Sequence, residues 1–462
     1  MNFCKLLRKT IKLKSCVRYL NNYKTFSKRQ RIEEIRKTVF PKSRKNPVIM
    51  KLETPEFKSI FTDELNLLIK LFKDNGFELR VAGGAVRDLL MGNKPKDLDF
   101  ATTATPDQMK ELFTNEGIRM INMKGEKHGT ITARINDKEN FEITTLRVDL
   151  VTDGRHADVQ FTTDWLLDAN RRDLTINSMY LCFDGTVIDY FYGYEDLKKR
   201  RVCFVGDAET RIIEDYLRIL RYFRFFGRIS ERPDTHEEVT LEAIRKNASG
   251  LGQVSGERIW VELKQILEGN FAGELALTIL DCGIGPYIGL PNKVRIDELQ
   301  RVWGKGKHLS LKGITLLTSL LSNEEDALAL HNRLKLSAYE RDLALFIIQH
   351  RAPKPSPDPL LPYQKLVVLG KGKDIKDYVI QVLKYNNSPY IQDFESWIPP
   401  KFPVTGTMLK DYGVESGKFM GAVLSELKEI WAESKFNKTI DELLKDVPHI
   451  VSTLKERKKV KQ

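Results

Sequence analysis

Two kinds of hydrophobic pattern divide the chain. From about Phe57 to Phe204, short runs rich in β-branched and aromatic residues alternate with helical stretches, which is typical of a mixed α/β domain. The clearest predicted strands are residues 78–82, 130–135, 141–146 and 186–190. After Ile212, apolar residues recur at i, i+3 and i+4, which predicts amphipathic helices. The clearest of these are residues 241–244, 259–267, 316–321 and 343–348.

The second half of the pattern is interrupted once by prolines. Residues 352–359 contain four prolines, and we expect them to end one helical segment and begin the last one. The sequence shows no internal repeat. The pattern as a whole predicts an α+β protein, with an N-terminal mixed-sheet head followed by an all-α extension.

Composition narrows the class of partner. The chain has 462 residues, with 41% hydrophobic residues and a net charge of +12, so it is long enough for roughly three globular domains. The excess of positive charge indicates an anionic partner, and nucleic acid is the leading candidate. The mean hydropathy of −0.36 and the lack of a long apolar run predict that the protein has no membrane span.

Much of the positive charge lies at the N-terminus. Residues 1–32 contain ten Lys and Arg residues and no Asp or Glu, with apolar residues interspersed. We predict that residues 1–49 are a mitochondrial transit peptide that directs the protein to the matrix. A disordered basic arm that contacts RNA is the alternative, and Met50 offers a second start for a cytosolic or nuclear form. The five cysteines include no C-x-x-C pair, so neither a zinc site nor a disulfide framework is predicted.

A pair of aspartates, Asp97 and Asp99, carries the first candidate chemistry. Residues i and i+2 of a strand point to the same face, so we expect the two carboxylates to converge and to need cations between them. Carboxylate oxygens favour Mg²⁺, whose remaining positions suit phosphate oxygens and water. Upstream, Gly84 lets the backbone approach a triphosphate, and Arg87 can bind it through two N–H groups. A lone D-x-D is usually a solvated turn, but here the preceding Gly-Gly-x-x-Arg favours a nucleotide site.

A second polar cluster comes just before an apolar run at residues 179–181. Arg172 can bind phosphate, and Asp173 or Asn177 can bind ribose hydroxyls, which would favour ribonucleotides over deoxyribonucleotides. A helix cap with surface charges is the alternative interpretation.

The third cluster, residues 214–226, combines acidic, basic and aromatic side chains. On a helix, Asp215 and Arg218 would be neighbours at i and i+3, with Arg221 and Arg224 continuing the row. Cytosine and adenine each present an amine beside an unprotonated ring nitrogen, whereas uracil and guanine present a carbonyl beside a ring N–H. A carboxylate next to a guanidinium therefore matches C and A only. An intrahelical salt bridge between Asp215 and Arg218 is the alternative.

These clusters resemble an enzyme family. Residues 83–99, 171–179, 189–197, 214–225 and 255–259 are similar, in order, to the five motifs of the class II tRNA nucleotidyltransferases, and the animal CCA-adding enzymes are the branch they most resemble. Further similarity occurs at residues 125–130, 403–406 and 416–418.

The resemblance implies a division of the chain. We expect a polymerase beta-like nucleotidyltransferase head at residues 50–205 and a helical neck with the nucleotide-templating helix at residues 206–275. A helical body would follow at residues 276–352. A helical tail at residues 353–462 would bind tRNA, and the helical parts together would contact its acceptor and T arms. The oligomeric state stays open.

The resemblance also assigns roles by position. Asp97 and Asp99 would be catalytic and would bind Mg²⁺, and Glu142 is a candidate third carboxylate. Asp173 and Asn177 belong to the second motif. The residues expected around ATP or CTP are Gly84, Arg87, Arg172, Asp215, Arg218, Arg221 and Arg224. A mixed-charge stretch would adjust the template between C and A addition; its residues are Arg147, Asp149, Asp153 and Arg155.

The implied activity is the addition of C, C and A to the 3′ end of tRNA from CTP and ATP, without a nucleic-acid template and with release of pyrophosphate. Two Mg²⁺ ions would assist the displacement. A bacterial-type poly(A) polymerase, or an enzyme restricted to CC or A addition, shares the head motifs and is the alternative. A non-catalytic RNA-binding module would have no need of Asp97 and Asp99 together.

Overall fold

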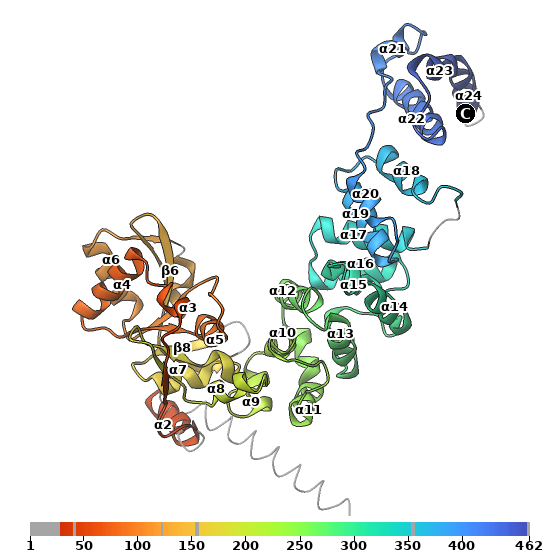
Figure 1. The fold of residues 1–462 in the computed structure, drawn as a ribbon. Helices are drawn as coiled ribbons and strands as arrows, with labels where there is room; N and C mark the ends of the chain where they lie inside the picture. Colours follow the sequence, from red (N-terminus) through yellow and green to blue (C-terminus); the bar gives the residue numbers. More distant parts are fainter. Residues whose placement is uncertain (1–27, 40–42, 122, 153–156, 353–355, 460–462) are drawn as a thin grey trace, which may run out of the picture. The chain divides into compact units, whose positions relative to one another are not determined.

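The computed structural model describes residues 28–39, 43–121, 123–152, 157–352 and 356–459 (Figure 1). The chain divides into two compact units, residues 1–287 and 288–462. The first unit contains every strand of the described chain, and the second is helical. The predicted α+β fold, with a mixed-sheet head before an all-α extension, is confirmed.

An eight-stranded mixed sheet forms the centre of the first unit. Its strand order is β1-β10-β9-β2-β3-β6-β5-β4, and the β3–β6 pair is parallel whereas the other pairs are antiparallel. A separate hairpin pairs β7 with β8. The strands are β1 (Val48–Lys51), β2 (Leu79–Ala82), β3 (Asp99–Thr102), β4 (Arg119–Ile121), β5 (Thr130–Ile135), β6 (Glu139–Thr145), β7 (Arg147–Thr152), β8 (Ala157–Phe161), β9 (Tyr180–Leu181) and β10 (Thr186–Ile188).

Helices pack against this sheet. Helix α4 contacts β2 and β5, and α6 contacts β4 and β5, with Phe72 of α4 and Phe113 of α6 fully buried and their ring centroids 6.0 Å apart. Both helices begin at a threonine cap, Thr62 and Thr105, which satisfies backbone N–H groups of the first turn. The helices that belong to the sheet region are α2 (Lys28–Val39), α3 (Pro55–Lys58), α4 (Asp63–Asp74), α5 (Gly84–Leu90), α6 (Pro106–Asn115), α7 (Trp165–Arg171) and α8 (Gly193–Lys198), with 3₁₀ helices η2 (Met123–His128) and η3 (Thr175–Asn177).

The first unit ends in a helical part. Helix α10 packs against α12 and α13, and α9 packs against α11. The bounds are α9 (Ala208–Glu214), α10 (Arg218–Ile229), α11 (Glu238–Asn247), α12 (Gly256–Leu267) and α13 (Ala272–Asp281), with 3₁₀ helices η4 (Ala248–Gln253) and η5 (Gly285–Ile288). The break between α9 and α10 is packed on Gly250, because a Cβ atom there would lie 2.0 Å from Cδ1 of Tyr216.

The second unit is a series of helices. Its bounds are α14 (Ile296–Gly306), α15 (Gly313–Thr318), α16 (Glu324–Leu334), α17 (Ala338–His350), α18 (Leu361–Leu369), α19 (Ile375–Tyr385), α20 (Ile391–Ser396), α21 (Gly406–Lys410), α22 (Lys418–Glu433), α23 (Ile440–Lys445) and α24 (Val447–Lys459). The proline-rich segment separates α17 from α18, as predicted. Leu409, Leu427 and Trp431 belong to one buried apolar cluster of this unit. None of the helices in the described ranges is long and apolar enough to cross a membrane.

Part of the predicted N-terminal leader lies on the head. Ile32 and Ile35 of α2 pack against Val148 and Leu167, which are themselves buried. Residues 1–27 of that leader lie outside the described residues. The segment after α2 also contacts the head, because Arg44 lies 2.6 Å from Glu195 and 3.6 Å from the fully buried Asp189, and β1 pairs with β10.

These contacts predict different effects of two N-terminal deletions. Relative to a chain that begins at Lys28, one that begins at Ser43 should have a melting temperature lower by about 2–5 °C, because burial of Ile32 and Ile35 contributes roughly 1–2 kcal/mol. A form that starts at Met50 should melt lower still, since it also lacks Arg44. Thermal unfolding followed by circular dichroism measures all three, and equal melting temperatures would contradict the role of α2.

Candidate functional site

A cavity of about 980 Å³ in the first unit is lined by the sheet edge and by helices α10 and α12. Every residue predicted for the site except Asp97 lines it. The predicted lining residues are Gly84, Arg87, Asp99, Glu142, Arg172, Asp173, Asn177, Asp215, Arg218, Arg221 and Arg224. The structure thus gathers residues that are up to 140 positions apart in the sequence around one space.

Carboxylates lie at one wall of the cavity. Asp99 is the first residue of β3 and stands beside Glu142 in the parallel β3–β6 register. The expectation that a strand carries both Asp97 and Asp99 is wrong, because Asp97 lies in the bend before β3, where Pro95 cannot donate to a ladder. The two carboxylates are nevertheless electrostatically coupled: burial raises the pKa of Asp99, and the charge of Asp97 raises it further.

The same wall is short of positive charge. Burial and the charge of Asp99 raise the pKa of Glu142, and no described Lys or Arg forms an ion pair with Asp97, Asp99 or Glu142. Within the described ranges, no group of three or more His, Cys, Asp or Glu residues has the arrangement of a metal site. Two coupled carboxylates with a third beside them still suit a divalent cation that takes its other ligands from phosphate and water.

The Gly-Gly turn leads into α5 and places Arg87. Gly83 has φ 65°, and a Cβ atom on it would lie 3.1 Å from Nη1 of Arg172, so glycine serves both the turn and the approach of Arg172. Arg87 is buried; its Nη1 donates to Oδ1 of Asn177 at 2.6 Å, and its Nε and Nη2 donate to Asp88. Burial lowers the pKa of Arg87, although Asp88 opposes the shift.

The segment that contains Asp215 is not a continuous helix. Asp215 ends α9 in an extended conformation, and α10 begins at Arg218, so the expected i, i+3 neighbourhood on one helix is wrong. The reason is local, because Oδ1 of Asp215 accepts from the N–H of Leu217, and such a side-chain bond replaces the helical one. The alternative intrahelical salt bridge does not form either: Asp215 pairs with Arg258 at 2.8 Å, and Arg218 pairs with Glu214 at 2.6 Å.

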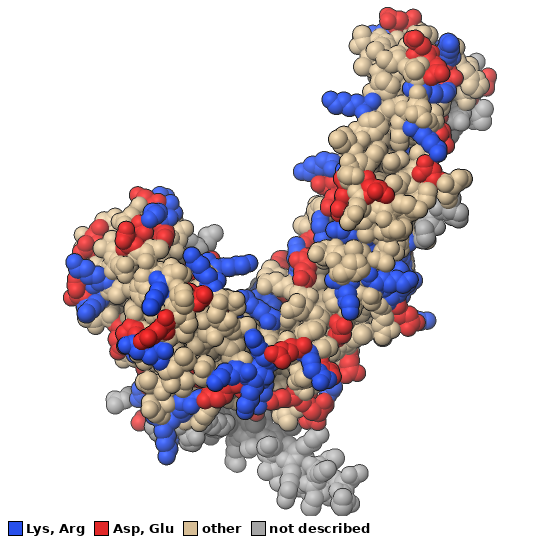
Figure 2. Space-filling view, in the orientation of Figure 1, with Lys and Arg blue, Asp and Glu red and all other residues tan. Residues whose placement is uncertain are grey.

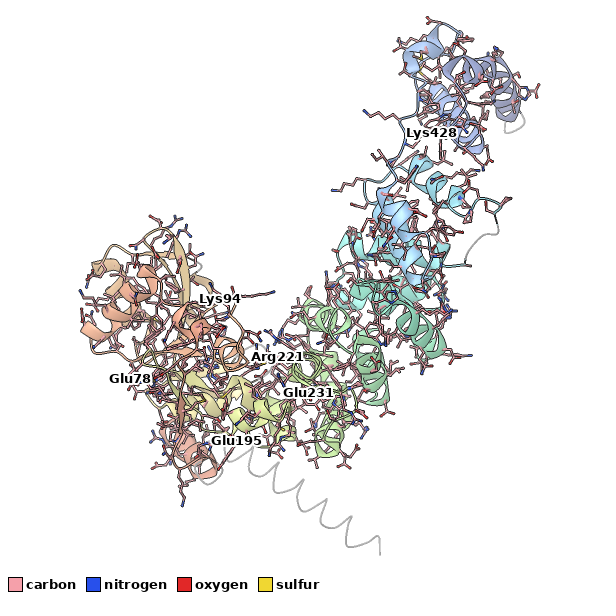
Figure 3. The ribbon with its side chains drawn as sticks, viewed as in Figure 1. Glu78, Lys94, Glu195, Arg221, Glu231 and Lys428 are labelled. Carbon is pink, nitrogen blue, oxygen red and sulfur yellow. The ribbon has the colours of Figure 1, made fainter. Side chains whose placement is uncertain are left out.

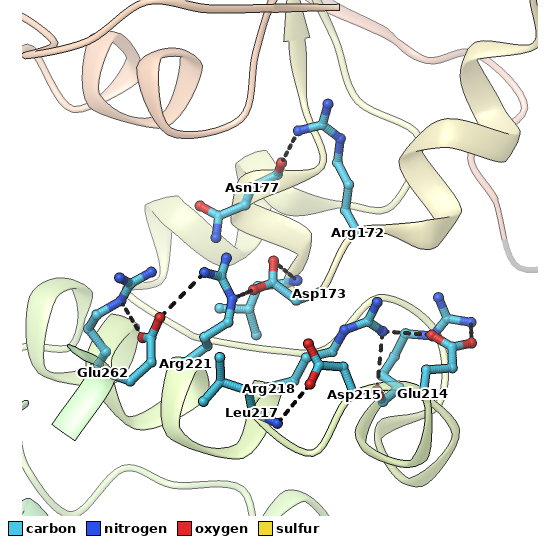
Figure 4. Close-up of polar contacts among 12 residues, drawn as sticks. Arg172, Asp173, Asn177, Glu214, Asp215, Leu217, Arg218, Arg221 and Glu262 are labelled. Carbon is cyan, nitrogen blue, oxygen red and sulfur yellow. Dashed lines mark hydrogen bonds and ion pairs between the residues drawn. The ribbon is translucent and has the colours of Figure 1, made fainter. Parts of the chain in front are cut away.

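Arg218 is held by two backbone carbonyls as well as by Glu214, whose contact Figure 4 shows. Its Nη1 donates to the carbonyl of Arg211 at 3.1 Å, and its Nη2 donates to that of Arg171 at 3.0 Å. Glu214 is therefore one of three acceptors around one guanidinium. Asp215 and Arg218 still both line the cavity, side by side in the chain and with separate supports.

The next two arginines of α10 are paired with buried carboxylates. Arg221 lies on α10 (Figure 3), and its Nε donates to Oδ2 of Asp173, in the segment between α7 and η3, at 2.6 Å (Figure 4). Nε of Arg224 lies 3.1 Å from Oε2 of Glu262, a residue of α12 that is 5% exposed. Both guanidinium groups lie near the ring of Phe225. Arginines buried among aromatic residues are destabilising without anions nearby, and these carboxylates supply them.

Two cavity residues, Arg171 and Arg258, and one partner of a cavity arginine, Glu262, escaped the sequence reasoning. Glu262 stands on the buried face of an amphipathic helix, and a carboxylate at such a core position is the signal that could have found it. Arg258 lies in the fifth motif, residues 255–259, for which the sequence predicted no contact with the nucleotide. Arg147 of the predicted mixed-charge stretch also lines the cavity. Of the mixed-charge stretch, Asp149 lies 3.3 Å from Nε of Arg147, and Asp153 and Arg155 lie outside the described residues.

Comparison with known proteins gives a consistent result. Residues 79–203 match the poly A polymerase head domain family, and residues 235–288 match the family described as the probable RNA and SrmB-binding site of polymerase A. The chain is 54% identical over 400 residues to the human CCA tRNA nucleotidyltransferase 1, mitochondrial, with 86% of this chain and 92% of the human protein covered. It is 36% identical over 236 residues to a CCA-adding enzyme of Geobacillus kaustophilus, which spans 50% of this chain and 55% of that protein.

Solved structures share the fold. The Bacillus stearothermophilus CCA-adding enzyme in complex with CTP matches with a TM-score of 0.66 and 25% identity, over 88% of this chain and all of that one. The Thermotoga maritima CCA-adding enzyme complexed with tRNA matches with a TM-score of 0.63 and 19% identity, over 88% of this chain and 99% of that one.

The coupling between Asp97 and Asp99 predicts that removing one of the two charges stabilises the folded protein. Burial and the charge of Asp97 raise the pKa of Asp99 in the folded protein, which means that the charged form of Asp99 is destabilised there, and removing the charge of Asp97 should relieve the repulsive part of this effect. In chelator, Asp97→Asn should raise the melting temperature by on the order of 1 °C, and a divalent cation should stabilise it less than the wild type.

Asp107→Asn is the matched control, because the Asp107 side chain is 89% exposed and pairs with Lys110. That change should not raise the melting temperature. A lower melting temperature of Asp97→Asn in chelator would show that the two carboxylates do not repel one another.

Proposed function

The chain belongs to the family of CCA-adding tRNA nucleotidyltransferases, and from this premise we propose that it adds C, C and A to the 3′ end of tRNA, using CTP and ATP. The observation that carries the proposal is the 54% identity that extends over 92% of the human relative. The single cavity that gathers the predicted carboxylates and arginines gives the proposal its chemistry.

The reaction forms one bond and breaks another. The 3′-oxygen of tRNA attacks the α-phosphorus of the incoming nucleotide, and the bond from that phosphorus to the β-phosphate oxygen breaks, so that pyrophosphate leaves. We propose Mg²⁺ as the divalent ion, held by Asp97 and Asp99, with Glu142 as the neighbouring third carboxylate. When bound, this ion supplies Lewis-acid stabilisation of the charge that develops on phosphate oxygens.

The chain's arginines would hold the rest of the nucleotide. Nη1 of Arg172 lies in the space beside Gly83 and donates to the carbonyl of Asn177. Arg172 would bind phosphate together with the backbone near Gly84. The buried Arg87 donates to the side chain of Asn177 and so supports the proposed contact of Asn177 with ribose. The carboxylate of Asp173 accepts a hydrogen bond from Arg221, and like Asn177 it would bind a ribose hydroxyl.

Base selection is proposed for Asp215 and Arg218. Their supports come from other residues, so the acceptor and the donor do not neutralise one another. A base that brings an amine beside an unprotonated ring nitrogen finds both partners in place, whereas uracil meets like polarity. Arg221 and Arg224 would keep α10 fixed through Asp173 and Glu262.

The tRNA itself would be bound by the helical parts. The second unit carries exposed lysines at Lys371, Lys373, Lys401, Lys410 and Lys418, and Lys and Arg side chains occur on the face of both units that Figure 2 shows. Phosphate attraction of this kind is independent of sequence, which suits an enzyme that acts on many tRNAs. We propose that the acceptor and T arms lie here, and that the protein is mitochondrial like its human relative.

The poly(A) polymerase head family that residues 79–203 match makes that activity the second candidate. A tRNA transcript that lacks its CCA end, incubated with CTP, ATP and Mg²⁺, separates the candidates by product length. A CCA-adding enzyme stops after three nucleotides, a poly(A) polymerase continues, and a partial enzyme stops after CC or adds only A. No extension at all would contradict catalysis.

The carboxylates should be essential for incorporation but not for tRNA binding. Asp97→Ala and Asp99→Ala are each expected to lower incorporation by at least about 10³-fold, because the cation that stabilises the displacement loses a ligand. Asp107→Ala, at an exposed position of the same domain, should keep wild-type activity. Activity is measured by radiolabelled CMP incorporation and tRNA affinity by filter binding; wild-type incorporation by either site variant would overturn the assignment.

Arg218→Ala should weaken the choice among nucleotides. Loss of the donor beside Asp215 is expected to lower kcat/KM for CTP and ATP by about 10²-fold and to shrink their advantage over UTP. The control is Arg232→Ala, which removes an exposed arginine that forms an ion pair with the equally exposed Asp234. An Arg218→Ala enzyme with unchanged preference among the four nucleotides would remove Arg218 from the template.

A further inference from the structure

We infer that Asp168, in helix α7, is a positioning residue that presets three arginines of the cavity for nucleotide binding. The inference rests on the proposed function, since it concerns how the same cavity holds CTP and ATP. Asp168 is not one of the residues that line the cavity. It acts through Arg147, Arg171 and Arg172, which do line it.

Both oxygens of Asp168 are occupied by donors from different parts of the head. Oδ1 accepts from Nε of Arg171 at 2.8 Å and from the backbone N–H of Arg147 at 3.1 Å. Oδ2 accepts from the hydroxyl of Tyr180 at 2.6 Å and from Nη2 of Arg172 at 3.4 Å. The residue is 1% exposed, so water cannot replace any of these partners.

The charge of Asp168 is what holds the arginines together. Burial alone would raise its pKa, but Arg171 and Arg172 bring it down to about 2, so the group stays ionised. In turn, although burial opposes its charge, Arg172 has a raised pKa because of Tyr180 and Asp168. Without this carboxylate, the charges of Arg171, Arg172 and Arg147 would face one another across a buried space, where repulsion is strong.

The orientation of Arg172 depends on this anchor. One end of its guanidinium meets Asp168, and Nη1 donates to the carbonyl of Asn177 at 3.2 Å. Its Cζ lies 5.0 Å from the ring centroid of Tyr180, and Gly83 leaves the space for Nη1. A guanidinium fixed at both ends is ready for a phosphate without further ordering.

The same anchor reaches the base-reading side of the cavity. Arg171, whose side chain is bonded to Asp168, offers its backbone carbonyl to Nη2 of Arg218. Arg147 begins strand β7, and its side chain bonds the carbonyl of His128, another cavity residue. The carboxylate of Asp168 therefore contacts Arg172, proposed to bind phosphate, and the start of the β7–β8 hairpin directly. It contacts Arg218, proposed to read the base, through Arg171.

The test is Asp168→Asn, which keeps the shape but brings an amide that itself donates to a place already crowded with donors. We expect KM for CTP and for ATP to rise by about 10-fold or more, with a smaller advantage of CTP over UTP. KM for tRNA should stay at its wild-type value, because the helical parts that would bind tRNA are untouched.

Two further variants separate positioning from folding. Asp189→Asn changes an equally buried aspartate that bonds the backbone N–H groups of Phe191, Gly193 and Tyr194; it should lower the melting temperature without raising KM for CTP. Tyr180→Phe removes one bond to Asp168 and keeps the ring, so it should fold and raise KM for CTP by about 2- to 10-fold. If Asp168→Asn does not fold, Tyr180→Phe alone decides.

A double-mutant cycle tests whether Asp168 acts through Arg172. If it does, Asp168→Asn should raise KM for CTP by a smaller factor in an Arg172→Ala background than in the wild type, because one of the three arginines that it positions is gone. Full additivity, or a wild-type KM for CTP in both Asp168→Asn and Tyr180→Phe, would overturn the inference. Failure of the wild-type protein to extend tRNA would instead overturn the proposed function.

Discussion

Pairing of buried arginines with carboxylates is the constraint on which the cavity depends. A guanidinium group taken out of water is strongly destabilising unless an anion meets it. Arg172 is met by Asp168 of the preceding helix α7, Arg221 of α10 by Asp173, and Arg224 of α10 by Glu262 of α12. Helix α10 cannot slide along its neighbours without separating the last two pairs, so charge as well as packing fixes its position.

The cavity is divided by this pairing into two unlike ends. The arginine end is balanced, because each guanidinium described above already has a partner. The carboxylate end is not, since burial and the charge of Asp97 raise the pKa of Asp99 against the opposing charge of Arg172, and burial and the charge of Asp99 raise the pKa of Glu142. An imbalance of this kind is stabilised by a ligand that brings positive charge to one end and negative charge to the other, which a metal-bound nucleoside triphosphate does.

Residue type and spacing predicted the members of the site better than its backbone. The Gly-Gly turn, the second motif and the arginine row predicted residues that the structure places around one cavity, and of the two aspartates Asp99 lines it. The strand through Asp97 and the helix through Asp215 were wrong for local reasons: Pro95 precedes the first, and the Asp215 side chain caps Leu217 in the second. An interruption of a strand or helix of this kind depends on one hydrogen bond or one missing donor, and the periodicity of apolar residues does not predict it.

Asp168 escaped for a different reason. Four residues before an arginine on a helix, a carboxylate resembles a surface ion pair, and most such pairs contribute little. Only tertiary structure shows that this one is buried under Tyr180 and accepts from the first residue of β7. Sequence spacing indicates which charged residues can form ion pairs. How much a pair contributes depends on how deeply it is buried, and burial is determined by the tertiary structure.

The way Arg218 is held shows how rigidity and recognition coexist. A guanidinium has five N–H groups, and the bonds to Glu214, Arg211 and Arg171 engage two on Nη1 and one on Nη2. Within the described part of the chain, the Nε hydrogen and one hydrogen of Nη2 have no hydrogen-bond acceptor. Each oxygen of Asp215 likewise accepts one bond, from Leu217 or Arg258, and keeps a second lone pair. The supports thus fix the direction of both groups and leave a free donor site on Arg218 and a free acceptor site on Asp215. This pair of sites is complementary to the amine and the unprotonated ring nitrogen that cytosine and adenine both present.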